Sequence, residues 1–291
     1  MQELAQAKIN LTLHIGAPIS EPSHRFYGYH PLSSLVVFAD VGDVLRAEPA
    51  DKTDLRISGP FAQGLETDET NLILKAYRAV RARADLPDFS FHLEKNLPIA
   101  SGIGGGSANA AAVLRLMYPQ TDLAAGVWDD IALSLGADVP VCFGSQTAIM
   151  EGIGEHLRPV GRLGRLFGIL VNPKVSVSTK EIFKRYKDYN PRAVPSDQAC
   201  GDPASGQALW DMTLGGRNDL QAPAIDQAPI IGHVIETIKQ THGCALARMS
   251  GSGATCFGLY QRKEDAKAAV KFIQENYPQW WCVLTGFGDK S

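Results

Sequence analysis

Four glycines within five positions, leading directly into a helical run of small residues, constrain this chain more than any other feature. The segment spans residues 98–112 and reads PIASGIGGGSANAAA. Glycine lets the backbone adopt positive φ and lets a ligand approach main-chain N–H groups closely. The N-terminus of the helix that follows carries roughly half a positive charge and several unpaired N–H groups. We therefore expect an anion site here, most naturally for nucleotide phosphates, with a flexible turn before a packed helix as the alternative.

Two familiar phosphate-binding loops do not fit this segment. A Walker A loop ends in Gly-Lys-Ser/Thr, whereas Gly106 is followed by Ser107 and Ala108 with no lysine. A dinucleotide-binding fingerprint that started at Gly102 would need its third glycine at position 107, which is serine. It would also follow its strand tightly, but residues 95–101 separate the loop from the strand-like run before it. The loop is therefore of a third kind.

Composition and charge exclude several classes of protein. The 291 residues suffice for one large domain or two ordinary ones, and 45% hydrophobic with 20% charged residues is typical of a globular protein. A net charge of −3 without a long basic run indicates no nucleic-acid binding. The five cysteines form no CxxC pair, which favours free thiols in a reducing cytosol over disulfides or a zinc site. Without a membrane-length apolar run or a signal-peptide pattern, we expect a cytoplasmic protein that binds no membrane.

The N-terminal half contains several strand patterns and few helices. Apolar and polar residues alternate over 8–15, which predicts a half-buried strand with Lys8 and Asn10 on one face. Taken alone, that polar face favours a solvated sheet edge. Further strands are predicted at 34–38, 44–47, 55–58, 89–93 and 147–150, and helices at 71–84, 107–117 and 128–135. This order indicates an α+β fold rather than a regular βαβ alternation.

The C-terminal half has a different pattern, and we place a domain boundary near residue 158, giving domains 1–158 and 159–291. Ser178 and Glu181 form a capping box that opens a helix ending at 186. Strands are expected at 167–171 and 175–177, and a long surface loop at 188–207. The tail then reads helix 230–240, strands 245–249 and 255–260, helix 264–275 and strand 281–285. This αββαβ order suits a ferredoxin-like domain.

A second glycine cluster, SGSGA at 250–254, lies between two predicted strands. A hairpin that needs positive φ would explain one or two of its glycines. The alternation of serine and glycine also suits a backbone that lines a bound anion. The sequence alone leaves both explanations open.

A candidate catalytic carboxylate occurs at Asp138, in the segment GADVP. Gly136 is expected to end the preceding helix in the left-handed conformation, and Pro140 to prevent the helix from resuming. Asp138 is then held in a turn with apolar residues behind it. It is either a turn-forming aspartate or a general base in a partly dry pocket.

The order of these segments is more informative than each one alone. Together with AKIN at 7–10, GYH at 28–30 and GIGE at 152–155, they resemble the GHMP kinase superfamily over nearly the whole chain. Within it, the pattern is most similar to kinases of a cytidine diphosphate-linked polyol in non-mevalonate isoprenoid biosynthesis. The resemblance implies an N-terminal mixed β/α nucleotide-binding domain and a C-terminal ferredoxin-like domain, with the active site in the cleft between them.

The resemblance also implies residue roles, with ATP and Mg²⁺ as cofactors. Lys8 and Asp138 match the catalytic lysine and base. The ATP-binding positions are Asn71, Leu72, Lys95, Pro98, Ser101, Gly102, Gly104, Gly105, Gly106, Ser107, Ala108, Gly251, Ser252 and Gly253. The substrate-binding positions are Asn10, Tyr29, His30, Thr179 and Phe183. Ser107 is the one candidate metal ligand, and we expect a monomer or a weak homodimer.

Two positions depart from the family pattern. Tyr27 stands where an aspartate usually precedes Gly-Tyr-His, and Ala108 replaces a second serine. Two alternatives remain: another small-alcohol kinase of the superfamily, acting on homoserine or a mevalonate, or a non-catalytic ATP-binding sensor. A sensor could lose its base, whereas Lys8 and Asp138 are both present.

Overall fold

A computed structural model of the chain describes residues 1–161, 163–189, 194 and 206–288. Its packing divides into two units that interleave along the sequence. Unit 1 comprises Met1–Lys8, Val41–Ile99 and Gly104–Ser145, and unit 2 comprises Ile9–Asp40, Ala100–Ile103 and Gln146–Ser291. The boundary near residue 158 cuts the chain only once, and it stays a prediction of how the domains divide.

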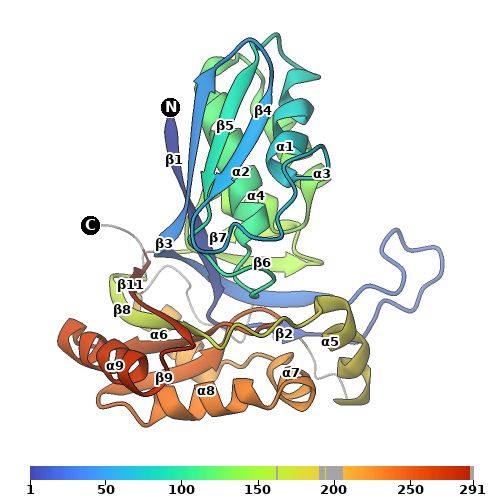
Figure 1. The fold of residues 1–291 in the computed structure, drawn as a ribbon. Helices are drawn as coiled ribbons and strands as arrows, with labels where there is room; N and C mark the ends of the chain where they lie inside the picture. Colours follow the sequence, from blue (N-terminus) through green and yellow to red (C-terminus); the bar gives the residue numbers. More distant parts are fainter. Residues whose placement is uncertain (162, 190–193, 195–205, 289–291) are drawn as a thin grey trace. The chain divides into compact units, whose positions relative to one another are not determined.

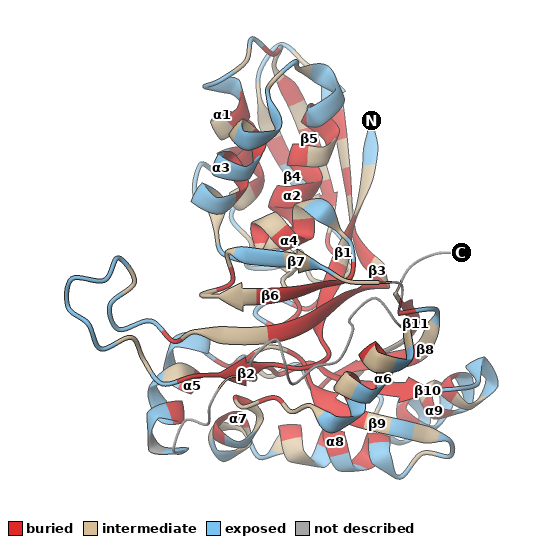
Figure 2. Cartoon of the chain, turned by 180° about the vertical axis from the view of Figure 1, so that it is seen from behind, coloured by how far each residue is buried: buried red, intermediate tan, exposed pale blue. Residues whose placement is uncertain are grey.

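Unit 1 is a small sheet with helices packed beside it (Figure 1). The strands are β1 (Gln2–Asn10), whose last two residues belong to unit 2, the second half of β3 (Leu32–Pro49), β4 (Asp54–Ser58) and β5 (Phe89–Glu94). The helices are α1 (Leu72–Arg81), α2 (Gly105–Met117), α3 (Ala125–Leu135) and α4 (Val139–Gly144), with a 3₁₀ turn at Tyr118–Gln120. β5 pairs antiparallel with β3 and parallel with β4. Small residues allow close packing of α2, which is buried along most of its length (Figure 2).

Unit 2 contains two groups of strands. In the first, β2 (His14–Ile15) and β6 (Ala148–Gly152) pair with the first half of β3, and β7 (His156–Pro159) pairs with β6. The second is an antiparallel set ordered β11 (Trp281–Phe287), β8 (Leu166–Asn172), β10 (Cys256–Tyr260) and β9 (Cys244–Met249). The helices are α5 (Thr179–Tyr186), α6 (Gly206–Gly215), α7 (Gln221–Gln227), α8 (Ile230–Lys239) and α9 (Lys263–Asn276), with a 3₁₀ turn at Lys187–Tyr189.

The predicted αββαβ tail is confirmed as α8, β9, β10, α9 and β11. Val234 of α8 and Ile273 of α9 are fully buried in the same core as Ile169 and Val171 of β8. Side chains two residues apart on a strand share one face, so both helices cover the same face of this sheet. The α+β prediction is confirmed as well.

Four predicted strands differ from the structure. The run at 8–15 is interrupted, because β1 ends at Asn10 and β2 begins at His14. The runs at 34–38 and 44–47 belong to one long strand, β3. The run at 175–177 is not a strand: Lys174 has a φ of 59° and its N–H donates to Asn172 Oδ1, which turns the chain where β8 ends. The strand β7 was not predicted, because its four residues show no apolar alternation.

The prediction that Pro140 stops the helix is wrong. Helix α4 begins at Val139, with Asp138 at its N-cap and Pro140 in its first turn. Proline is tolerated there because the first helical N–H groups have no partner inside the helix. Gly136 has φ 154° and ψ 155°, so it does not adopt the left-handed helical conformation that the sequence suggested. Helices α6 and α7 were not predicted either.

The solvated interpretation of the polar face at 8–14 is also wrong. Lys8, Asn10, Thr12 and His14 are 5%, 3%, 1% and 6% exposed. Alternation of apolar and polar residues predicts which side chains share a face of the strand. The packing of the rest of the chain decides whether that face is exposed to solvent. Four buried polar groups in a row require partners, and those partners define the candidate site below.

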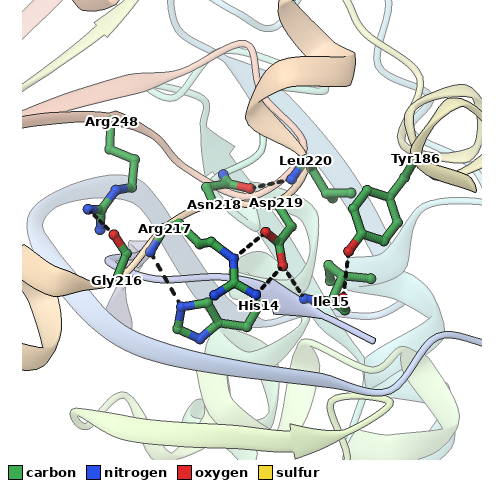
Figure 3. A network of polar contacts seen from close by, with 9 residues as sticks. All are labelled: His14, Ile15, Tyr186, Gly216, Arg217, Asn218, Asp219, Leu220 and Arg248. Atoms are coloured by element: carbon green, nitrogen blue, oxygen red, sulfur yellow. Dashed lines mark hydrogen bonds and ion pairs between the residues drawn. The ribbon is translucent and has the colours of Figure 1, made fainter. Parts of the chain in front are cut away.

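A buried imidazole sits in a network of polar contacts in unit 2 (Figure 3). The N–H of Arg217 donates to His14 Nε2 at 3.4 Å, and Asp219 accepts hydrogen bonds from the Arg217 side chain and from the N–H of Ile15. Burial, followed by the charge of Arg217, lowers the pKa of His14 from 6.5 to about 4, and Arg248 acts in the same direction while Asp219 opposes it. The folded protein therefore keeps His14 neutral in mildly acidic solution.

This network predicts acid sensitivity of the fold. Because the pKa of His14 is lower in the folded state, its contribution to stability is complete above pH 6.5 and is lost as the pH falls toward about 4. The free energy of unfolding should fall by up to about 1.4 kcal/mol per pH unit in that window. Urea denaturation across the window measures this slope. His14→Gln should flatten it, and an unchanged slope in that variant would contradict the assignment.

The described cysteines are free thiols, as predicted. Cys142, Cys256 and Cys282 are buried and Cys244 is half-buried, while Cys200 lies outside the described residues. Most of the loop predicted at 188–207 also lies outside them. Within the described ranges, no helix has the length and apolar character needed to cross a membrane.

Candidate active site

An ion pair in unit 1 joins the two predicted catalytic residues. Lys8, near the end of β1, places Nζ 2.8 Å from Oδ1 of Asp138. The Lys8 side chain is 6% exposed and that of Asp138 is 36% exposed. Asp138 occupies the N-cap of α4, yet its side chain makes no capping hydrogen bond. A carboxylate in this position can accept a proton from a ligand while a fixed cation stands beside it.

The elements that carry this pair are tied together by Arg115 of α2. Its guanidinium donates to Glu3 Oε1 and to the carbonyl of Leu4 on β1, and also to the carbonyl of Cys142 on α4. A second link joins Ser145, directly after α4, to Gln6 of β1 at 2.9 Å. These hydrogen bonds fix β1 and α4 relative to each other at the positions of Lys8 and Asp138.

The glycine loop leads into α2 as the sequence predicts. Gly104 is the N-cap, with a left-handed φ of 66° and no side-chain cap. A Cβ on Gly104 would lie 3.3 Å from Lys8 Cβ, so the backbone approaches the lysine closely. No capping side chain satisfies the N–H groups of this helix end, and a cation lies beside it, which suits an anion. Ser107 is half-buried in the first turn and Ala108 is buried.

A second, fully buried ion pair in unit 1 joins Lys95 to Asp43. Lys95 Nζ lies 2.5 Å from Asp43 Oδ2, and Asp43 Oδ1 accepts the N–H groups of Asn96 and Leu97. Burial lowers the pKa of Lys95, although Asp43 opposes that shift. A Cβ on Gly105 would lie 3.3 Å from Lys95 Nζ, so this lysine also borders the start of α2.

Sequence reasoning missed Asp43. The available signal was a carboxylate inside the apolar run of β3, where a charge needs a buried partner. Among the other predicted nucleotide residues of unit 1, Asn71 caps α1 by accepting the N–H of Ile73. A Cβ on Gly106 would lie 3.4 Å from Leu72, and Pro98 is buried.

In unit 2, the loop at 250–254 packs against the start of the first glycine loop. Ser250 Oγ donates to the carbonyl of Gly102 at 3.2 Å, and the N–H of Thr255 donates to the carbonyl of Ser101. Gly251 has a φ of 54°, and a Cβ there would lie 2.5 Å from the Gly102 carbonyl oxygen. The loop does connect two antiparallel strands, β9 and β10, as a hairpin would. Its glycines are also required by this close backbone contact.

Asn10 presents an unused acceptor in the same unit. Its Nδ2 donates to Ser34 Oγ at 2.7 Å, and Ser34 donates onward to the carbonyl of Thr12. The Asn10 N–H donates to Ser250 Oγ at 3.1 Å. Asn10 Oδ1 is buried and has no partner among the described residues. Such an acceptor is suited to a donor on a ligand.

The remaining predicted substrate residues form two small groups in unit 2. The rings of His30 and Phe183 lie 5.8 Å apart, and His30 Nδ1 bonds the carbonyl of Gly16. Thr179 and Ser252 share a hydrogen bond of 2.7 Å. Tyr29 is 59% exposed, with its ring beside Phe26. The substrate-binding roles of Tyr29 and Phe183 stay predictions.

No cluster of acidic, histidine or cysteine side chains suited to a metal occurs in the described part of the chain. The role of Ser107 as a metal ligand stays a prediction.

The sequence of this chain matches known proteins over most of its length. Residues 71–145 match the model of the GHMP kinase N-terminal domain, and residues 210–279 match that of the GHMP kinase C-terminal region. A protein of Parvibaculum lavamentivorans named 4-diphosphocytidyl-2-C-methyl-D-erythritol kinase is 44% identical over 289 residues, which is 98% of each chain. A protein of the same name from Roseobacter denitrificans is 42% identical and covers 100% of this chain and 95% of its own.

Solved structures agree with the sequence matches. A crystal structure titled 4-(cytidine 5'-diphospho)-2C-methyl-D-erythritol kinase is similar with a TM-score of 0.78 and 25% identity, covering 100% of both chains. Homoserine kinase from Cytophaga hutchinsonii is similar with a TM-score of 0.67 and 15% identity, which shows a shared fold.

Proposed function

Because this chain belongs to the GHMP kinase family, we propose that it transfers the γ-phosphate of ATP to the tertiary 2-hydroxyl of 4-diphosphocytidyl-2-C-methyl-D-erythritol, a step of non-mevalonate isoprenoid biosynthesis. The observation that carries the proposal is the pair of Lys8 and Asp138, joined at 2.8 Å. Its position supports the same view, since a Cβ on Gly104, the N-cap of α2, would lie 3.3 Å from Lys8 Cβ. A base, a cation and a phosphate site are thereby combined.

The acceptor explains why a base is needed. A tertiary alcohol is un-ionised at neutral pH, so its proton must leave as its oxygen bonds to the γ-phosphorus and the bond from that phosphorus to ADP breaks. Asp138 accepts this proton, an effect worth about 10²- to 10⁴-fold in rate. Lys8 lies beside this carboxylate and offsets negative charge in the transition state. Positioning of the reactants supplies most of the remaining acceleration.

The ATP phosphates are proposed to bind the backbone of residues 101–107 and of the loop at 250–254. The N-cap of α2 supports this, because Gly104 caps the helix without a side chain and leaves its first N–H groups to an anion. Mg²⁺ would arrive with the nucleotide and neutralise phosphate charge, with the Ser107 hydroxyl as its protein ligand. Asn71, Leu72, Lys95 and Pro98 are assigned to the remainder of the nucleotide.

The acceptor is assigned to unit 2 residues and to the end of β1. His30 and Phe183 are proposed to bind the cytosine, with His30 reading the base edge and Tyr29 closing over it. The free Asn10 Oδ1 accepts a hydroxyl of the polyol. Thr179, bonded to Ser252, links the acceptor segment to the phosphate loop. We further propose a cytoplasmic enzyme that is a monomer or a weak homodimer.

A coupled ADP-release assay with ATP and Mg²⁺ tests the function. Turnover with 4-diphosphocytidyl-2-C-methyl-D-erythritol, and none with homoserine or mevalonate, is the expected result. Equal or greater turnover with an alcohol lacking the cytidine moiety would overturn the substrate assignment. ATP binding without turnover on any of the three alcohols would contradict the kinase role and favour a sensor.

A further inference from the structure

Asn218 lies just before α7, and its buried amide is bonded at both ends. The residue is 7% exposed. Nδ2 donates to the carbonyl of Met249 at 2.8 Å and to the carbonyl of Gly251 at 2.8 Å. Oδ1 accepts the N–H of Leu220 at 2.9 Å (Figure 3). Both donor hydrogens are therefore committed to the loop at 250–254 and its preceding strand.

The backbone around Asn218 gives its side chain little freedom. The N–H of Leu13 donates to the carbonyl of Arg217 at 2.7 Å, and the N–H of Asp219 donates to the carbonyl of Leu13 at 2.9 Å. Asp219 also accepts the N–H of Ile15 through its carboxylate. The segment that carries Asn218 is therefore fixed by hydrogen bonds on both sides. Its side-chain amide holds the loop at 250–254 in one position.

This amide sets the direction of a loop peptide. The Gly251 carbonyl points at Asn218, and the peptide joining Gly251 to Ser252 is trans. In a trans peptide the N–H points opposite to the C=O. The Ser252 N–H therefore points away from Asn218, and it has no hydrogen-bond partner within the residues that the structure describes. An N–H oriented in this way is available to an anion.

We propose that Asn218 is a positioning residue for nucleotide binding: it clamps Met249 and Gly251 so that the 250–254 loop presents its N–H groups to the phosphates. The inference rests on the proposed assignment of that loop to ATP. It predicts that Asn218 affects nucleotide affinity without contacting the nucleotide. A purely structural role would instead lower stability and affect both substrates alike.

Asn218→Asp tests the proposal, since it keeps the side-chain shape and removes both donors. The carboxylate faces two carbonyl oxygens, so the loop should rotate or separate. We expect the KM and the Kd for ATP to rise about 10- to 100-fold through loss of two buried hydrogen bonds. The KM for the alcohol should change by less than about threefold on the same reasoning.

The pH dependence of ATP binding to N218D separates the proposed role from general destabilisation. Burial beside carbonyls raises the pKa of a carboxyl, and the protonated acid can donate one hydrogen bond. The Kd of ATP for N218D should therefore approach the wild-type value as the pH is lowered from about 8 to about 5.5. Calorimetric titration with ATP and Mg²⁺ alone measures it, so failure of the proposed phosphoryl transfer would not obscure the result.

Asn276→Asp is the matched control. Asn276 is exposed at the end of α9 and donates only to the Phe272 carbonyl, so ATP binding should be unchanged. If N218D does not fold, Asn218→Ser retains one donor and should give a smaller rise in the Kd for ATP. A folded N218D or N218S that binds ATP as the wild type does, or that weakens both substrates equally at every pH, would overturn the proposal.

Discussion

Replacing Asp138 with asparagine is expected to lower kcat by about 10²- to 10⁴-fold, because the amide cannot accept the hydroxyl proton. The KM for ATP should stay within about threefold of the wild-type value, since the loss occurs in the transition state. Steady-state kinetics on purified protein measure both constants. The near-identical shape of the two side chains makes this a test of the proton acceptor rather than of packing.

Stability must be measured beside the kinetics of D138N. The variant removes the counter-charge of Lys8, whose side chain is 6% exposed, and an unpaired buried charge is costly. Thermal unfolding therefore separates lost folding from lost chemistry. Asp129→Asn, an exposed change on α3, is the matched control and should leave kcat unaltered. A folded D138N with wild-type kcat would remove Asp138 from the mechanism.

Replacing Arg248 with methionine is expected to cost about 3–5 kcal/mol of folding free energy, because three buried carbonyls lose their hydrogen-bond donor. Arg248 is 7% exposed, and its guanidinium donates to the carbonyls of Leu11, Thr213 and Gly216. Burial lowers its pKa to about 10, so it remains charged at neutral pH. Methionine fills similar space but leaves three acceptors without donors, each worth about 1–3 kcal/mol when buried.

Urea denaturation of R248M measures this cost. Arg262→Met is the matched control in the same unit: the Arg262 side chain is 69% exposed and its ion pair with Asp265 spans 3.8 Å. Exposed pairs of this kind contribute about 0–1 kcal/mol. Equal stability losses in the two variants would show that the Arg248 contacts do not hold the fold.

Helices whose sequence pattern lies within a few neighbouring residues were predicted well. The capping box at Ser178 is confirmed by the N-cap of α5, and the helix at 71–84 by the amphipathic α1. Each depends on residues within a few positions of one another. The prediction around Pro140 was wrong because proline both ends and begins helices, and only the packed chain shows which applies.

The candidate site also contains residues that belong to short motifs and residues whose role depends on distant partners. The ion pair between Lys8 and Asp138 agrees with the roles that the family resemblance implies. Asp43 and Asn218 went unrecognised, because neither belongs to a motif with a readable spacing. Their importance derives from partners far along the chain: Lys95 for Asp43, and the loop at 250–254 for Asn218.

By itself, the sequence determined the α+β class, the order of the C-terminal elements and the two glycine loops, which rest on backbone preferences and short spacings within the chain. The candidate base and lysine came from the resemblance to a family. Only the tertiary structure decided that the polar face of Lys8, Asn10, Thr12 and His14 is buried and which groups satisfy it. The physical reason is that burial and hydrogen-bond pairing depend on which distant segments pack together, and periodicity records only which side chains point the same way.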